Sequence, residues 1–396
     1  MWKIRAVLTS KHLLLSLLAL VCILLVLVGC ASPTRRVASA SVVEALSRGQ
    51  GDFALAMAPI PLTFPRDHGP HPEYRTEWWY FIGNLTDDQG RRYGYQLTFF
   101  RSSLAAEVPQ RDSELATNQL YMAHFAVTSV PAGRHLSFER FSRGAGGLAG
   151  AQGEPSFGVW LEDWTARQTG PGTYELTATT QHDEGPVALH LTLRETRPPL
   201  LHGDAGLSQK GPEPGNANYY YSLVQLETTG ELTIAGERHN VTGVSWMDHE
   251  FGTSFLSGDT KGWDWFAVQL ENGIVFMFGE FHNGLGDERS VYAGTLALPD
   301  GRQFKLEEAD FELHALGEWR SPRTGITYPA GWRVLFPAHE IELMIEPLVA
   351  DQEMDVTFIY YEGATRVQAQ VADQKVGGVG YVELTGYSDV AGGYHR

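Results

Sequence analysis

Carboxylates lie among tryptophans in two segments of the chain, and this mixture could support acid catalysis. Asp248 and Glu250 belong to residues 243–252, and Asp264 lies within residues 262–266. A carboxyl that apolar walls shield from water gains a raised pKa and can then protonate a double bond or a leaving group. A second carboxylate could activate water, and indole faces could stabilise a cation that develops between the two. Both segments therefore predict a pocket that binds an apolar molecule and offers it a proton.

The side-chain alternation of a β-strand predicts which of these residues act together. In an extended strand, Asp248 and Glu250 share the face of Trp246, whereas His249 points the other way. An alternative hypothesis is that both carboxylates anchor two domains to each other, by bonding to backbone groups or to Arg and His side chains.

Alternation in the second segment places Trp263 and Trp265 on one face and Asp264 on the other. Asp264 is a candidate catalytic residue, and the alternative is a carboxylate that caps a loop at the start of a strand.

A lone histidine is a further candidate for proton transfer. The alternating run 121–127 puts His124 on one face with Met122 and Ala126, and we expect this face to line a barrel interior. Histidine is the natural proton carrier near neutral pH, although a buried core histidine is the alternative. Trp78 and Tyr80 also share a face, either as ligand-binding residues or as ordinary core aromatics.

These patterns give two groups of candidate residues. The candidate catalytic residues are Asp248, Glu250, Asp264 and His124, and the candidate ligand-binding residues are Trp78, Tyr80, Trp246, Trp263 and Trp265. The sequence has no zinc-protease His-Glu-x-x-His motif, no Gly-x-Ser-x-Gly elbow and no dinucleotide fingerprint. We therefore predict no metal and no cofactor, and a serine hydrolase has no support.

The amino terminus predicts an envelope lipoprotein. Residues 1–29 read as a signal peptide, because a basic start is followed by the apolar run 13–28. The run ends before Cys30, in a pattern typical of a lipobox, so Cys30 is the predicted lipid-anchored first residue of the mature chain. Ala31 after this cysteine favours the outer membrane, facing the periplasm. Residues 30–60 read as a flexible tether.

Charge excludes one class of partner. Removal of Lys3, Arg5 and Lys11 from the 30 basic residues leaves 27 against 47 acidic ones, a net charge of −20. Such a chain is not expected to bind nucleic acid, and the membrane contact would come from the lipid.

The pattern after Phe64 predicts an all-β fold of two tandem, antiparallel barrels related by internal duplication. Short runs rich in Val, Thr and aromatic residues alternate with turn signals, of which Asn272–Gly273 is the clearest. Three segments recur in the same order: residues 78–85 match 263–270, residues 121–134 match 292–302, and residues 241–248 match 376–383. The predicted domains are residues 61–255 and 256–396.

These motifs resemble a known family. The segments 77–85, 210–222, 243–252, 262–266 and 380–387 are similar to those of the AttH proteins and carotenoid 1,2-hydratases. The resemblance implies two lipocalin-like barrels in tandem, and the lipoprotein signal fits the AttH branch better than the carotenoid branch.

Together these features predict an envelope protein that binds a hydrophobic small molecule, with the pocket in or near the first barrel. The enzyme hypothesis is a hydratase that acts by acid catalysis on an isoprenoid-like lipophile. One alternative is a non-enzymatic carrier or accessory protein for an ABC exporter, a partner that the family resemblance implies. A second alternative is a structural envelope protein.

Overall fold

The computed structural model describes residues 52–107, 113, 116–211, 213–253, 260–282 and 291–387. The predicted signal peptide, Cys30 and most of the predicted tether lie outside the described residues. The described part of the chain belongs to one compact unit, residues 40–396. Within it, no helix has the length and apolarity needed to cross a membrane.

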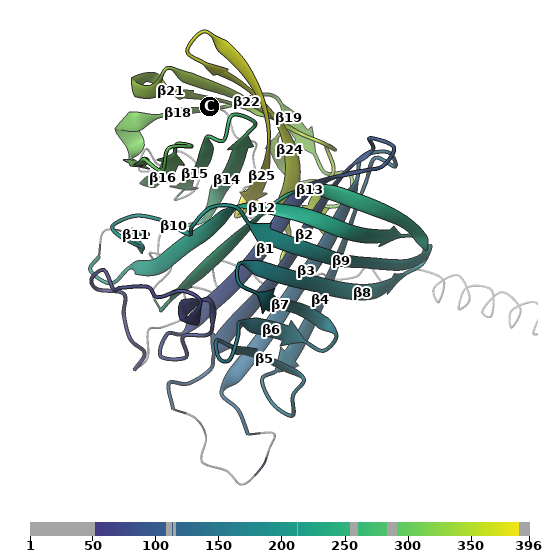
Figure 1. Ribbon diagram of the computed structural model, residues 1–396, viewed down its shortest axis with the longest axis vertical. Coiled ribbons are helices and arrows are strands. Elements are labelled where there is room, and N and C mark those ends of the chain that lie inside the picture. Colours follow the sequence, from purple (N-terminus) through teal and green to yellow (C-terminus); the bar gives the residue numbers. More distant parts are fainter. Residues whose placement is uncertain are drawn as a thin grey trace, which may run out of the picture. The chain divides into compact units, whose positions relative to one another are not determined.

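Two antiparallel sheets make up almost all of this unit (Figure 1). The strands of the first sheet are β1 (Thr76–Asp87), β2 (Arg92–Ser103), β3 (Gln119–Ser129), β4 (Arg134–Arg143), β5 (Ala149–Gln152), β6 (Gly158–Leu161), β7 (Trp164–Gly170), β8 (Thr173–His182), β9 (Gly185–Glu195), β10 (Leu200–Leu201), β11 (Leu207–Gln209), β12 (Ala217–Ile234) and β13 (Glu237–Gly252).

The second sheet follows in the chain. Its strands are β14 (Gly262–Leu270), β15 (Val275–His282), β16 (Val291–Ala297), β17 (Gln303–Leu306), β18 (Glu312–Ala315), β21 (Trp332–Phe336), β22 (Ile341–Pro347), β23 (Glu353–Met354), β24 (Tyr360–Val371) and β25 (Gln374–Leu384). A separate hairpin is formed by β19 (Glu318–Arg320) and β20 (Thr327–Pro329), and the short 3-10 helices are η1 (Arg66–His68), η2 (Glu308–Asp310) and η3 (Pro337–His339).

The predicted all-β fold is confirmed, with one refinement in its shape. The first sheet curls into a nearly closed barrel, whereas the second forms a half-barrel (Figure 1). Large buried side chains, including Trp79, Phe99, Phe125 and Trp164, pack inside the first barrel. Its interior is therefore largely core.

The two sheets share one strand order. The first runs β4-β3-β2-β1-β13-β12-β9-β8, and the second runs β17-β16-β15-β14-β25-β24-β22-β21. The three matched sequence segments fall on corresponding strands, namely β1 with β14, β3 with β16, and β13 with β25. This agreement supports an internal duplication. The predicted Asn272–Gly273 turn joins β14 to β15, with Gly273 at a φ of +83°.

The outer face of the first barrel packs against the second sheet. Ile82 and Trp246 of the first sheet belong to one buried cluster with Ala267, Val275 and Ala364 of the second. Because successive side chains of a strand point to opposite faces, β1 and β13 fill the barrel with one set of residues and the junction between the sheets with the other.

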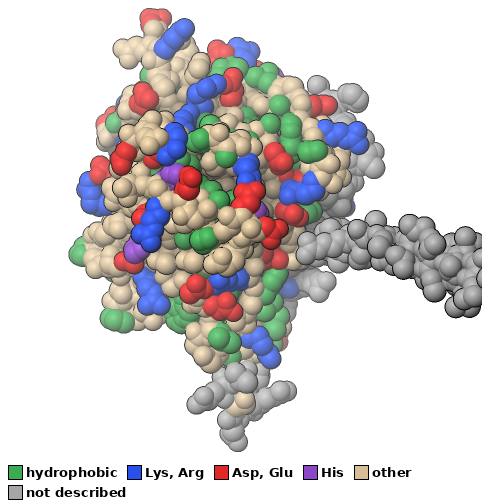
Figure 2. All heavy atoms as spheres, turned by 90° about the vertical axis from the view of Figure 1, so that its right-hand side faces the viewer, with side chains coloured by type: hydrophobic (Ala, Val, Ile, Leu, Met, Phe, Trp, Pro, Cys, Tyr) green, Lys and Arg blue, Asp and Glu red, His purple; other side chains and the backbone are tan. Residues whose placement is uncertain are grey.

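Charged residues of both signs are mixed on one face of the molecule. On the face drawn in Figure 2, Lys and Arg side chains are interspersed with Asp and Glu and do not gather into a basic patch.

Candidate functional site

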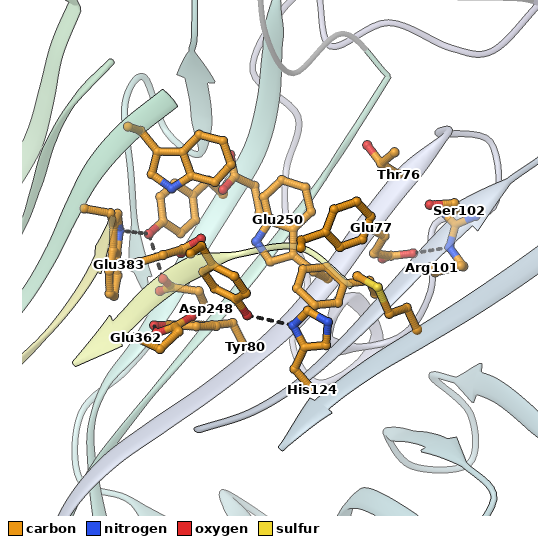
Figure 3. A pocket seen from close by; sticks show the side chains of 18 of the residues that line it. Thr76, Glu77, Tyr80, Arg101, Ser102, His124, Asp248, Glu250, Glu362 and Glu383 are labelled. Carbon is orange, nitrogen blue, oxygen red and sulfur yellow. Dashed lines mark hydrogen bonds and ion pairs between the residues drawn. The ribbon is translucent and has the colours of Figure 1, made fainter. Parts of the chain in front are cut away.

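A cavity of about 230 Å³ lies between the two sheets, and residues of both line it (Figure 3). It lies beside the first barrel, on the face of β1 and β13 that carries Tyr80 and Asp248. The barrel interior has little room for a ligand because its own aromatic core occupies it.

Three side chains hold the carboxyl of Asp248 in this cavity. Its Oδ1 accepts hydrogen bonds from Trp246 Nε1, at 2.6 Å, and from the hydroxyl of Ser222. Its Oδ2 accepts from the hydroxyl of Tyr220 at 2.9 Å, and that hydroxyl accepts in turn from Trp265 Nε1 at 3.1 Å. These donors fix the orientation of the carboxyl toward the cavity.

The surroundings also set the protonation of Asp248. Burial raises its pKa to about 7, because the charged form is poorly solvated there. The hydrogen bonds from Ser222, Trp246 and Tyr220 oppose this shift, while the nearby Glu250 adds to it. Asp248 is therefore present in both protonation states near neutral pH, as an acid that must lose and regain a proton requires.

Glu250 has a different environment although it lies two residues away on the same face. Lys210 Nζ is 2.6 Å from Glu250 Oε1, and Asn218 donates to the same oxygen at 3.2 Å. Burial raises the pKa of Glu250, and Lys210 opposes that shift by favouring the ionised form. The predicted sharing of one face by Trp246, Asp248 and Glu250 agrees with the structure, since Asp248 and Glu250 both line the cavity and Trp246 reaches Asp248.

Two further carboxyls were not among the candidates that the sequence suggested. Glu362 and Glu383 are cross-strand partners on β24 and β25, and both line the cavity (Figure 3). Glu362 is buried and Glu383 is half-buried. Burial raises the pKa of Glu383 to about 8, and it raises the pKa of Glu362 well above its usual range, with Glu383 adding to the shift. The repeat matches Glu383 to Asp248, whereas no local motif marks Glu362.

His124 lies in the cavity wall, so the expectation that it faces the barrel interior is wrong. Its Nδ1 is 2.7 Å from the hydroxyl of Tyr360 in the second sheet, and its Nε2 is 3.2 Å from Glu139. The neighbours Ala123 and Phe125 belong to the barrel core instead. Alternation correctly grouped the residues of this strand but did not reveal which group faces inward.

The predicted aromatic residues fall into two sets. Trp78, Tyr80, Trp263 and Trp265 line the cavity. Trp246 is buried and does not line the cavity, but its indole nitrogen donates a hydrogen bond to Asp248.

Asp264 is separated from the other predicted catalytic residues. As alternation predicts, it lies on the face opposite Trp263 and Trp265, where the hydroxyl of Tyr387 donates to both of its oxygens at 2.9 Å. There it borders a second cavity, of about 530 Å³, inside the half-barrel. The structure thus brings together Asp248, Glu250 and His124, and leaves Asp264 elsewhere.

A second chain of contacts that the sequence did not suggest supports Asp248. His202 Nε2 is 2.6 Å from the hydroxyl of Ser222, and its Nδ1 is 2.9 Å from Thr295 Oγ1 in the second sheet. Burial lowers the pKa of His202 to about 3, with Lys210 adding to the shift, so this ring is neutral. Neutral His202 orients the Ser222 hydroxyl that binds Asp248.

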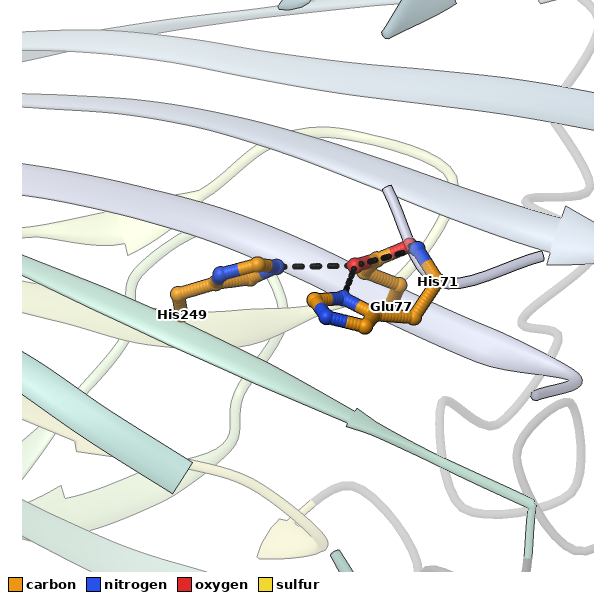
Figure 4. A group of neighbouring side chains, drawn as sticks. All are labelled: His71, Glu77 and His249. Atoms are coloured by element: carbon orange, nitrogen blue, oxygen red, sulfur yellow. Dashed lines mark hydrogen bonds and ion pairs between the residues drawn. The ribbon is translucent and has the colours of Figure 1, made fainter. Parts of the chain in front are cut away.

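One group of side chains has the composition of a metal site. His71, Glu77 and His249 offer ligand atoms that all lie within 4.8 Å of one another (Figure 4). Glu77 Oε1 accepts from His71 Nδ1 at 2.9 Å and from His249 Nε2 at 2.8 Å, while Oε2 accepts from Arg101 Nε at 2.8 Å. These donors already satisfy the buried carboxylate, and the Arg101 cation beside it disfavours a metal ion.

Comparison with known proteins places this architecture in a family. The AttH-like family model matches residues 55–387. The crystal structure of an AttH protein from Nitrosomonas europaea is 30% identical, with a TM-score of 0.74, and the match covers 85% of this chain and 100% of that chain.

Two more distant structures share the fold. Kievitone hydratase from Nectria haematococca is 16% identical, with a TM-score of 0.63, over 86% of this chain and 97% of that chain. CghA, solved with Sch210972, is 14% identical, with a TM-score of 0.50, over 87% and 98% of the two chains. No curated protein matches this sequence. Since the family model spans most of the chain and the Nitrosomonas protein is matched over its full length, the chain belongs to the AttH-like family.

Proposed function

We propose that this protein binds an apolar small molecule in the cavity between its sheets and adds water to it, or rearranges it, by acid catalysis. The observation that carries this proposal is Asp248, a buried carboxyl in an aromatic-walled cavity with a pKa of about 7. A general acid works best when its pKa lies near the working pH.

The geometry suggests a role for each group. The protonated form of Asp248 gives its proton to a carbon–carbon double bond, which leaves a carbocation that the faces of Trp265 and Tyr80 stabilise. Glu250, in its ion pair with Lys210, takes a proton from water as the water oxygen bonds to the cation. The product has gained one water molecule, and transfer of that proton back to Asp248 restores the site.

The cavity limits the size of the ligand. Its volume of about 230 Å³ exceeds the roughly 150 Å³ of a cavity that holds benzene, and it is below the range of about 300–1,000 Å³ typical of drug-sized ligands. We therefore expect a compact ligand, or the reactive end of a longer isoprenoid-like chain.

The named activity of one distant structure agrees with this reaction class. Kievitone hydratase shares the fold, and its name describes a hydration. We extend hydration to this chain only as a proposal, which rests on the cavity and its carboxyls.

Non-catalytic transport of the same ligand is the alternative, and one observation favours it. Both oxygens of Asp248 already accept hydrogen bonds from protein donors, as those of a purely structural anchor would. In either case we place the protein in the bacterial envelope, anchored through the predicted lipid on Cys30, and an ABC exporter is the partner proposed for a carrier.

The experiment that separates these functions works with an unidentified substrate. A total lipid extract of the native host is incubated with the purified protein in ¹⁸O-labelled water and analysed by mass spectrometry. We expect a product that is heavier than its precursor by one labelled water, and no such product with Asp248→Asn. Asp264→Asn, which changes a buried aspartate outside this cavity, is the matched control and retains the product.

A carrier would instead bind a lipophile without labelling it. Native mass spectrometry of the same protein would then show a bound molecule of unchanged mass, and the enzymatic proposal would be wrong.

A further inference from the structure

One end of the cavity already accommodates a cation. Lys210 Nζ lies 2.6 Å from Glu250 and 4.8 Å from the centre of the Tyr220 ring. A carboxylate combined with an aromatic face is the environment in which proteins bind ammonium groups. In this cavity the bound ammonium group is that of Lys210, a side chain of the protein itself.

The wall that the second sheet contributes also combines carboxyls with aromatic rings. Glu362 and Glu383 lie there side by side, Glu362 buried and Glu383 half-buried, and no Lys or Arg of the described chain forms an ion pair with either of them. Glu362 accepts a hydrogen bond from the hydroxyl of Tyr80 at 2.7 Å, and Glu383 accepts one from Trp263. Two neighbouring carboxyls remain neutral when their charges would repel each other, and a cation between them removes that cost.

The repeat shows that this arrangement is specific to the second copy. Asp248 pairs across the strands with Ser222, whereas its counterpart Glu383 pairs with Glu362. The first copy therefore surrounds one carboxyl with neutral donors, and the second copy places two carboxyls together. A neutral ligand would leave the two carboxyls at this end of the cavity without a cationic partner.

Aromatic rings complete this end. Tyr80 and Trp265 meet edge to face, with ring centres 5.5 Å apart, and Trp263, Phe358 and Tyr360 also line the cavity. Aromatic rings around paired carboxyls are complementary to a compact organic cation. The positive charge can be permanent, or it can form during a reaction.

We infer that Glu362, Glu383 and the aromatic rings around them form a cation-binding subsite, which takes a quaternary ammonium or carbocation-like end of an otherwise apolar ligand. This inference deepens the proposed function and rests on it in one respect, the use of this cavity as the ligand site. It adds a substrate class, namely ligands that carry or develop positive charge on a branched centre.

The test compares two molecules of the same shape that differ in charge. Benzyltrimethylammonium has a permanent cation, and neopentylbenzene has a neutral carbon in the same place. Their affinities for the wild-type protein are measured by titration of tryptophan fluorescence. We expect the cation to bind at least about tenfold more tightly, because only the cation gains from the carboxyls and ring faces.

Variants locate the effect. Glu362→Gln and Glu383→Gln keep the size of the side chain and remove its ability to ionise, so each should weaken cation binding several-fold and leave neopentylbenzene unchanged. Glu346→Gln changes an exposed glutamate of the same sheet, paired with Arg366, and should alter neither affinity. If a variant does not fold, the wild-type comparison alone still decides.

The outcomes separate the two claims. Equal or tighter binding of neopentylbenzene overturns the cation subsite and leaves the proposed function intact. Failure of both molecules to bind overturns the subsite together with the cavity as a ligand site. A charge preference with no labelled product from the lipid extract supports the subsite and counts against hydration.

Discussion

The hydroxyl of Tyr80 in the first sheet donates a hydrogen bond to Glu362 in the second sheet, over 2.7 Å. Tyr80 is also the cross-strand partner of Asp248, so one residue touches both acidic groups of the cavity. His124 with Tyr360, and Trp265 with Tyr220, make further contacts between the sheets. The site therefore exists only where the two sheets pack together.

Tyr80→Phe should weaken this junction. The change leaves the buried Glu362 with one donor fewer, so we expect the free energy of unfolding to fall by about 1–3 kcal/mol. Urea denaturation measures the loss. Tyr95→Phe is the control, because Tyr95 donates to Ser245, away from the cavity. We expect Tyr95→Phe to cost stability without changing ligand affinity, whereas Tyr80→Phe changes both. Unchanged stability and affinity in Tyr80→Phe would contradict the role of this contact.

Glu77→Gln should be among the most destabilising single changes. Burial favours the neutral form, but Arg101 and the two imidazoles outweigh it and hold the pKa of Glu77 well below its usual range. Loss of this charge leaves Arg101 buried without its partner, at a cost of about 3–5 kcal/mol. The exposed pair Arg366–Glu346 offers a comparison, since Glu346→Gln should cost about 0–1 kcal/mol. Equal unfolding midpoints for the two variants would show that the network is not structural.

Removal of metal ions should leave the fold unchanged. His71 and His249 already donate to Glu77, and Arg101 occupies the side where a cation would add repulsion. We expect the same melting temperature with a chelator or with added zinc, and no stoichiometric metal in the purified protein by elemental analysis. A zinc-dependent rise in melting temperature that His249→Gln abolishes would show that these side chains form a metal site after all.

Stability should fall as the pH rises above neutrality. The pKa of Asp248 is about 7 and that of Glu383 about 8, both raised by burial, whereas both carboxyls ionise near pH 4 in the unfolded chain. Between these values the folded state holds the extra protons, so the free energy of unfolding decreases as pH increases. Buried histidines such as His202 titrate near pH 6.5 in the unfolded chain and act in the opposite sense there, so the fall is measured above about pH 7.

Melting temperatures between about pH 7 and 8.5 measure this slope. Asp248→Asn and Glu383→Gln should each flatten it, because neither replacement ionises. A slope that both variants leave unchanged would contradict the raised pKa values.

Local patterns in the sequence predicted much of this site, and the reason is physical. Alternation along a strand fixes which side chains share a face. The sequence therefore predicted that Asp248 lies with Glu250 and that Asp264 lies apart from its neighbouring tryptophans. The repeat likewise aligned Asp248 with Glu383. Alternation does not say which face meets a second sheet, and for this reason His124 was assigned to the barrel interior.

Partners that meet only through packing were not predictable. Glu362 and Tyr360 lie more than 200 residues from Tyr80 and His124 along the chain. His202 reaches Ser222 from a connection next to β10 that carries no recognisable motif. Their roles follow from how the sheets pack together, which no short segment specifies.

The protonation of Asp248 is the most direct test of the proposed chemistry, and it requires no ligand. Infrared difference spectra of the wild-type protein and of Asp248→Asn, recorded across pH 5–9, isolate the signal of this one carboxyl. We predict a protonated carboxyl that titrates near pH 7 and is absent from the variant. If Asp248 is fully ionised throughout this range, it cannot be the acid, and the proposed chemistry is wrong.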